Sequence, residues 1–176
     1  MTSEIERLGG KGFRINLSNG FDLSARHGVN AAKQWLLDNR PREAWFSLPC
    51  TPWTSMQNAN ASTPEGWYKL QIKRKHARRM IRLCVELLET CIQIDCNPAW
   101  EQPLRAQSWN LKEYKRVHEL LTHKCRVDGC GYGMRAVDTG HLLLKQWRIQ
   151  CRTAEQAARI TKICQGNHSH EVLEGS

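Results

Sequence analysis

Cys50 and Glu101 are the side chains of this chain whose types and settings best suit covalent chemistry. Cys50 follows a proline at the end of the apolar residues 44–48, and Glu101 follows a Pro- and Trp-rich turn at residues 97–100. A cysteine just past a buried strand stands where an open α/β sheet presents its reactive groups. The pattern therefore predicts a thiol and a carboxylic acid at neighbouring strand ends.

A thiol and an acid placed in this way can attack a pyrimidine ring. Addition of a thiolate to ring carbon 6 makes carbon 5 nucleophilic, and an acid near ring nitrogen 3 holds the developing charge. Cys50 would supply the thiolate and Glu101 the acid, while Arg135 or Arg148 would help to hold the base. The alternative is that Cys50 is a buried structural thiol and that Glu101 pairs with a cation or acts as a cap.

Short motifs along the chain resemble, in the same order, those of DNA cytosine-5 methyltransferases. Residues 46–53 resemble the Pro-Cys motif, and residues 100–103 stand where the family carries Glu-Asn-Val. Residues 132–135 and 145–151 resemble the later Tyr-Gly and Arg-x-Arg segment and its following strand. The resemblance covers residues 12–152, and Pro-Cys-Thr in place of Pro-Cys-Gln indicates a divergent branch.

This resemblance implies a Rossmann-like α/β sheet with flanking helices, S-adenosylmethionine as methyl donor, and a cytosine flipped out of DNA. Cys50 would add to cytosine carbon 6, Glu101 would stabilise nitrogen 3, and Arg148 would complete the catalytic group. The methyl group would then pass to carbon 5. Asp22 matches the acid that contacts the adenine amino group of the cofactor, and Pro49 would also contact the cofactor.

Parts of the family pattern are missing from this sequence. The Gly-rich turn that cradles the methionine end of the cofactor has no counterpart, because no apolar strand precedes the glycines of residues 9–12. The acid that holds the ribose is also missing, since Asn16 and Ser18 stand there, and the target-recognition region is absent. We therefore expect an N-terminally shortened chain, a pocket completed by a partner chain or a preceding segment, or a non-catalytic nucleic-acid-binding module of the same fold.

The charge of the chain favours a polyanionic partner. The 176 residues carry a formal net charge of +9, and the pI is about 9.4. Nucleic acid, and DNA first, is the simplest such partner. The candidate contacts are Lys73, Arg74, Arg78, Arg82 and Arg135. Trp45, Trp53, Trp67, Trp100, Trp109 and Trp147 are further candidates, for stacking on bases. The alternatives are a solvated charged helix face and tryptophans that pack in the core.

The eight cysteines are not expected to form a disulfide framework. Cys84, Cys91 and Cys96 fall in apolar stretches, where reduced cysteine behaves as a small hydrophobic residue. The N-terminus is polar and does not resemble a signal peptide. We therefore expect an intracellular location, in nucleus or cytoplasm, rather than secretion. No apolar run approaches membrane-spanning length, and no membrane partner is expected.

Cys164, His168 and His170 form a second candidate site, close together after a predicted helix. Thiol and imidazole donors at such spacing suit zinc. The fourth ligand would be Cys130, or with less support Cys125 or Cys151. This pattern predicts a structural zinc site and, as a third hypothesis, a zinc-stabilised interaction domain. The alternative is a solvent-facing histidine pair beside a core cysteine.

The elements that must position these groups alternate between strands and helices over one domain, residues 1–176. Strands are expected at residues 13–17, 44–48, 124–128 and 142–151. Helices are expected at residues 29–39, 64–93, 111–121 and 153–164. Residues 152–176 are expected to form a C-terminal helix followed by a metal-binding tail. Residues 49–63 and 129–140 are expected to be loops. This alternation is typical of an α/β sheet with crossover connections.

Overall fold

Four strands form one mixed sheet in the computed structural model, which describes residues 9–171. They are β1 (Glu43–Ser47), β2 (Asn97–Pro103), β3 (His123–Asp128) and β4 (Gln146–Cys151), in the order β1-β2-β4-β3. β1 and β2 are parallel, whereas β4 is antiparallel to both of its neighbours. The carboxyl ends of β1 and β2 therefore lie at the same edge of the sheet.

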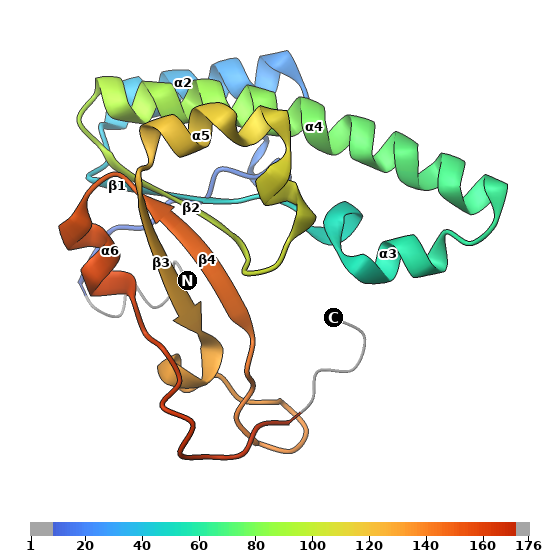
Figure 1. Cartoon of the computed structure of the whole chain (residues 1–176). Helices are drawn as coiled ribbons and strands as arrows, with labels where there is room; N and C mark the ends of the chain where they lie inside the picture. Colours follow the sequence, from blue (N-terminus) through green and yellow to red (C-terminus); the bar gives the residue numbers. More distant parts are fainter. Residues whose placement is uncertain (1–8, 172–176) are drawn as a thin grey trace.

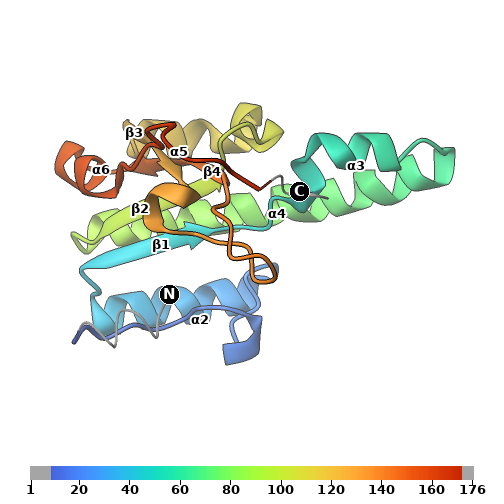
Figure 2. The same cartoon turned by 90° about the horizontal axis from the view of Figure 1, so that it is seen from below.

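Helices cover both faces of this sheet (Figures 1 and 2). One face carries α2 (Arg26–Asn39), α4 (Pro64–Gln93) and α5 (Lys115–Leu120), and the other carries α6 (Ala154–Ile160). The first half of α4 extends beyond the sheet, with the short α3 (Ser55–Asn60) beside it. The expected α/β class is confirmed, and none of the described helices is long and apolar enough to span a membrane.

The core is divided by the alternation of side chains along the strands. Phe46 of β1 and Trp100 of β2 are register partners that face α4 and stack with ring centroids 5.2 Å apart. Ala99 and Ile149 face the other way and pack beneath Ala157 of α6. The side chains of β2 therefore point alternately to the α4 face and to the α6 face of the sheet.

The long helix α4 begins and ends where the sequence predicted. The hydroxyl of Thr63 accepts a hydrogen bond from the Gly66 N–H at 3.1 Å, and Pro64 occupies the first turn, where its missing N–H costs nothing. Leu70, Cys84 and Leu88 lie on the apolar face that packs into the molecule. The capping residues and the helical periodicity both indicated this helix, and its predicted bounds are confirmed.

Residues 13–17 do not form the predicted strand. The Asn16 side chain instead accepts a hydrogen bond from the Asn19 N–H and starts the 3-10 turn η1 (Leu17–Asn19), and Gly20 follows with φ 84°. Phe13 stacks on Trp35 of α2 with ring centroids 4.5 Å apart. The alternating pattern was misleading because turn-forming residues end it at once and its aromatic side chain packs on a helix.

Other boundaries also differ from the predictions. The predicted loop 49–63 contains a 3-10 turn, η2 (Thr51–Trp53), and α3, while the predicted turn at residues 97–100 begins β2. β1 is only half-buried because it is an edge strand within the described residues. Residues 142–145 precede β4, and α6 ends at Ile160, beyond which Lys162 forms a bridge with Val127 of β3.

Candidate metal centre and the Cys50 loop

Two thiols and two imidazoles converge in the region where residues 130 and 164–170 meet. The ligand atoms of Cys130, Cys164, His168 and His170 all lie within 4.8 Å of one another. Cys164 Sγ is 3.5 Å from His168 Nε2 and 3.4 Å from His170 Nε2. Donors at zinc bond lengths on the corners of a tetrahedron lie roughly 3.3–3.8 Å apart. The arrangement could therefore hold a metal ion, and it unites all four residues predicted as ligands.

The ligands come from two segments that the backbone holds side by side. Cys130 lies in η5 (Gly129–Tyr132), which directly follows β3. The segment after α6 runs along β3, where Asp128 N–H donates to Lys162 O at 2.8 Å. At its other end the Glu171 N–H donates to Leu142 O at 2.9 Å. The segment with these three candidate ligands is thus attached to β3 at one end and to the residues that precede β4 at the other.

Asp128 connects the two ligand segments through its buried carboxylate. It accepts two hydrogen bonds from the Arg126 guanidinium, both at 2.8 Å, and one from Gln146 at 3.1 Å. A fourth comes from the backbone N–H of Cys164 at 2.9 Å. Such outer partners orient metal ligands. The sequence analysis missed Asp128, although its place just before the Gly129-Cys130 turn was a usable signal.

The histidines also have partners that set their orientation. His168 Nδ1 lies 2.9 Å from Asn167 Oδ1, and this contact leaves Nε2 free to face Cys164. The Gly166 N–H donates to Cys164 Sγ at 3.3 Å, which helps to fix the position of the sulfur. Two sulfur and two nitrogen donors match the ligands that tetrahedral zinc takes. The donor set therefore fits zinc.

Cys50 lies at the carboxyl edge of β1, in the turn that leads into η2. Its carbonyl accepts a hydrogen bond from Trp53 N–H at 2.9 Å, and its side chain is half-buried. The preceding Leu48 carbonyl accepts from the Gln102 side chain of β2 at 2.8 Å. Arg74 Nε donates to Pro52 O at 3.1 Å. The loop around Cys50 is therefore fixed to β2 on one side and to α4 on the other.

Glu101 stands next to β1 but on the α6 face of the sheet. It pairs in register with Ser47, whose hydroxyl donates to Glu101 Oε2 at 2.6 Å. Arg148 of β4 pairs in register with Gln102, the next residue of β2. Because successive residues alternate, Glu101 and Arg148 leave the sheet on opposite faces. The Arg148 guanidinium lies 5.2 Å from the Trp109 ring centroid, on the α5 side.

The residues predicted to bind the cofactor have local structural contacts. Asp22 Oδ1 accepts hydrogen bonds from the Ser24 N–H at 2.9 Å and the Ser24 hydroxyl at 2.6 Å, just before α2. The bond from the Ser24 hydroxyl is the main reason that the pKa of Asp22 is lowered. Pro49 is exposed at the end of β1. Because residues 13–17 form no strand, the described residues do not fit the cofactor cradle that the resemblance implies.

The predicted basic contacts fall on different surfaces. Arg74, Arg78 and Arg82 line one hollow on α4. Lys73 lies on another side of α4, at the rim of an apolar pocket. Arg135 is exposed in the loop after η5, where it donates to Gly140 O at 2.8 Å. Only the three arginines thus share one hollow.

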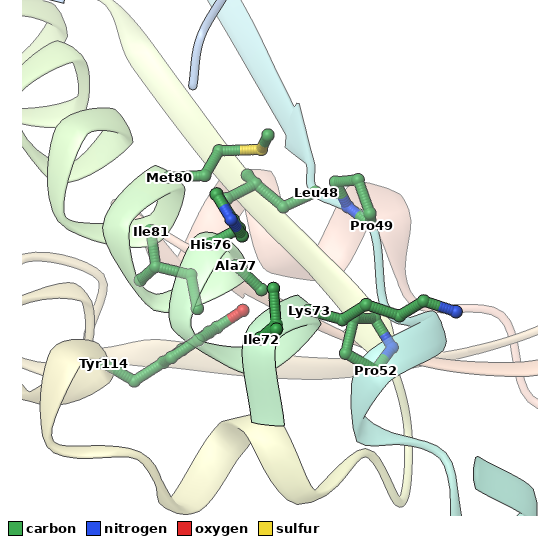
Figure 3. Close-up of a pocket in the computed structure, with 10 residues that line it drawn as sticks. All are labelled: Leu48, Pro49, Pro52, Ile72, Lys73, His76, Ala77, Met80, Ile81 and Tyr114. Atoms are coloured by element: carbon green, nitrogen blue, oxygen red, sulfur yellow. The ribbon is translucent and has the colours of Figure 1, made fainter. Parts of the chain in front are cut away.

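A pocket of about 380 Å³ lies between the Cys50 loop and α4. Figure 3 shows Leu48 and Pro49 on one side of it and the phenol of Tyr114 on the other, while the Lys73 ammonium group points away beyond Pro52. Burial is the main reason that the pKa of Tyr114 rises to about 12, so its hydroxyl stays protonated at neutral pH. The pocket wall is almost wholly apolar, and it is completed by Ile72, His76, Ala77, Met80 and Ile81.

Comparisons with protein-family models, curated proteins and solved structures returned no significant match. The resemblance to cytosine-5 methyltransferases therefore rests on the motifs of this chain alone. Two buried residues near these sites were not predicted from the sequence. Glu113 accepts a hydrogen bond from Arg78 of the α4 hollow at 3.0 Å, and Gln102 holds the Cys50 loop through Leu48 O. Their partners lie far away along the chain, and no local pattern marks them.

Proposed function

We propose that this chain is a nucleic-acid-binding domain of a methyltransferase-like α/β type, stabilised by structural zinc. The observation that carries the proposal is the convergence of Cys130, Cys164, His168 and His170. Four protein ligands close a tetrahedral site, whereas a catalytic zinc keeps a position for water or substrate. The zinc would therefore serve folding and not catalysis.

Zinc at this point would fasten the last described segment to the turn after β3. Cys130 belongs to that turn, and the other three ligands follow α6. A closed loop of this kind loses entropy when it orders, and metal–ligand bonds offset that cost. Removal of the metal is therefore expected to release residues 164–171 while the sheet and α4 remain folded.

The nucleic-acid part of the proposal is supported by charge. The net charge of +9 attracts polyanions, and three of the predicted basic residues line one hollow on α4. The test is fluorescence anisotropy of the zinc-loaded protein with a labelled DNA oligonucleotide over a range of salt concentrations. We expect binding at low salt that weakens steeply as salt rises. No binding at low salt would refute the nucleic-acid part.

Cobalt substitution tests the metal part separately. Co²⁺ in place of zinc should give the intense visible absorption of a tetrahedral site, with thiolate charge-transfer bands in the near ultraviolet. The Cys164→Ser variant should lose both signals, and Cys50→Ser should keep them because Cys50 is a half-buried thiol outside the cluster. A spectrum of hexaaquo cobalt with the wild-type protein would refute the site.

A second candidate function is covalent chemistry on cytosine, which the setting of Cys50 favours. The half-buried thiol lies just past the carboxyl end of β1, whose last residue, Ser47, pairs in register with Glu101 of the parallel strand β2. In this proposal the Cys50 thiolate forms a bond to cytosine carbon 6. The electrons of the 5,6 double bond form a 4,5 double bond, and those of the 3,4 double bond move to nitrogen 3. There they take the proton of the Glu101 carboxyl, which is left as a carboxylate. S-adenosylmethionine would need a cradle from a partner chain or another segment.

The covalent candidate can be tested with a DNA oligonucleotide containing 5-fluorocytosine. We expect an adduct on a denaturing gel in the presence of S-adenosylmethionine, lost in Cys50→Ser and kept in Cys164→Ser when zinc-free folding is verified. Calorimetry with S-adenosylmethionine measures cofactor affinity independently. Absence of the adduct with folded, cofactor-bound protein would refute this candidate and leave the non-catalytic binder.

A further inference from the structure

A basic hollow lies on α4, beside the Cys50 loop. Its lining residues, spaced by one to four positions, are Gln71, Arg74, Lys75, Arg78 and Arg82, and its volume is about 190 Å³. Residues three or four positions apart share one side of a helix, so that four cations crowd together. Like charges at this spacing destabilise a helix unless other groups compensate them.

The three arginines of the hollow are held in place by neighbouring groups. Arg78 and Arg82 donate to the two oxygens of Glu113 at 3.0 and 3.1 Å, and the Glu113 side chain is only 2% exposed. Arg74 donates to Pro52 O and, at 2.6 Å, to the side-chain oxygen of Asn58. Guanidinium groups fixed in advance lose less entropy when they bind an anion.

One carboxylate does not balance the charge of this hollow. Glu113 forms ion pairs with Arg78 and Arg82, so this one carboxylate pairs with two of the four cations that line the hollow. Burial, followed by the charge of Arg78, lowers the pKa of Arg74. Both effects mean that an anion entering the hollow would relieve unfavourable electrostatics.

Aromatic rings adjoin the same arginines. The Arg74 guanidinium carbon lies 5.5 Å from the Trp53 ring centroid and 5.7 Å from that of Trp67, and the Arg78 carbon lies 5.3 Å from Trp53. Trp53 is buried, but Trp67 is 49% exposed. An exposed indole beside fixed guanidinium groups is the combination on which single-stranded nucleic acid binds, with bases stacked and phosphates paired.

We propose that this hollow holds a backbone phosphate of single-stranded nucleic acid while Trp67 stacks on an adjoining base. The proposal rests on the proposed nucleic-acid binding and names its surface and its preferred strand form. Arg74 contacts the Cys50 loop through Pro52 O, and Trp53, which lies against Arg74, belongs to that loop. The bound strand would therefore pass beside the Cys50 loop.

Charge removal at Lys75 tests the phosphate contact. Lys75→Gln removes an exposed cation of the hollow, and Lys33→Gln removes an exposed cation of α2 as matched control. With a labelled single strand of about 16 nucleotides, Lys75→Gln should weaken binding about fivefold at ~0.1 M salt and reduce the salt slope by roughly 0.7. Equal effects of the two variants would overturn the proposal.

Replacement of Trp67 tests the base contact. Trp67 is 49% exposed, and Trp67→Ala should weaken binding of the single strand about tenfold. Trp67→Phe, which keeps an aromatic ring at this position, is the matched control and should largely retain binding. Thermal melting verifies that each variant is folded.

The outcomes separate this inference from the proposed function. If the wild type binds no oligonucleotide, the proposed nucleic-acid binding and the proposed contacts at the hollow are both refuted. If it binds but neither Lys75→Gln nor Trp67→Ala differs from its control, only this inference fails. Tighter binding to the duplex of the same sequence, or to phosphatidylserine vesicles, would also overturn it.

Discussion

Single buried polar side chains position the groups of three sites: the basic hollow, the Cys50 loop and the Cys/His cluster. Glu113 positions two arginines of the basic hollow, and Gln102 holds the strand end that precedes Cys50. Asp128 connects the metal ligand segments. Each lies on a different element from the groups that it positions, so each acts across the tertiary structure.

Glu113→Gln should destabilise the protein and loosen the basic hollow. The amide cannot compensate the charges of Arg78 and Arg82, which are 37% and 58% exposed, so we expect a loss of about 1–2 kcal/mol in the free energy of unfolding. Urea denaturation measures it. Glu119→Gln, which breaks an exposed pair with Arg116, should cost less than about 0.5 kcal/mol. Equal costs would contradict the role of Glu113.

Gln102→Met should free the loop that carries Cys50. Gln102 is 1% exposed, its amide nitrogen donates to Leu48 O, and its amide oxygen accepts from the Ser108 hydroxyl. A methionine of similar size removes both bonds without a large cavity. We expect a loss of about 2 kcal/mol in stability and faster alkylation of Cys50 by iodoacetamide, measured by peptide mass spectrometry. An unchanged alkylation rate would show that Gln102 does not restrain this loop.

Helices with local signals were predicted well, and the predicted strands at residues 44–48, 124–128 and 142–151 overlap β1, β3 and β4. The prediction failed at β2, which was missed, and at residues 13–17. Both ends of α4 follow from the cap at Thr63 and the apolar periodicity. β2 was taken for a turn because Pro98 and Pro103 usually interrupt strands, although the missing N–H groups are tolerated here. Residues 13–17 showed a strand pattern that no neighbouring strand supports. Strand identity depends on pairing, which single-sequence patterns do not contain.

Thr63→Ala should destabilise the first turn of α4. The Thr63 hydroxyl accepts the Gly66 N–H, and loss of such a cap costs about 1 kcal/mol. Ser62→Ala is the control, since no side-chain hydrogen bond of Ser62 is recorded among the described residues. Thermal unfolding of both variants gives the comparison. Because this turn carries Trp67, hydrogen exchange in residues 64–70 should rise in Thr63→Ala alone.

In the whole molecule, the proposed metal site lies far along the chain from the Cys50 loop. The local spacing of Cys164, His168 and His170 predicted three ligands, but Cys130 was one of three cysteines considered as the fourth. Tertiary structure decided among them, because β3 carries its following turn to the tail while Cys125 and Cys151 face the core beneath α6. The opposite faces of Glu101 and Arg148 could not be predicted without the register of β2 and β4.

The proposed zinc site is tested most directly by the zinc content of the protein, measured by elemental analysis after purification without added chelator. We predict one zinc ion per chain in the wild type and in Cys50→Ser, and none in Cys164→Ser. A strong chelator should lower the wild-type Tm by roughly 5–10 °C and leave the already lower Tm of Cys164→Ser unchanged. Folded wild-type protein that contains no zinc, even after growth with added zinc, would contradict the account.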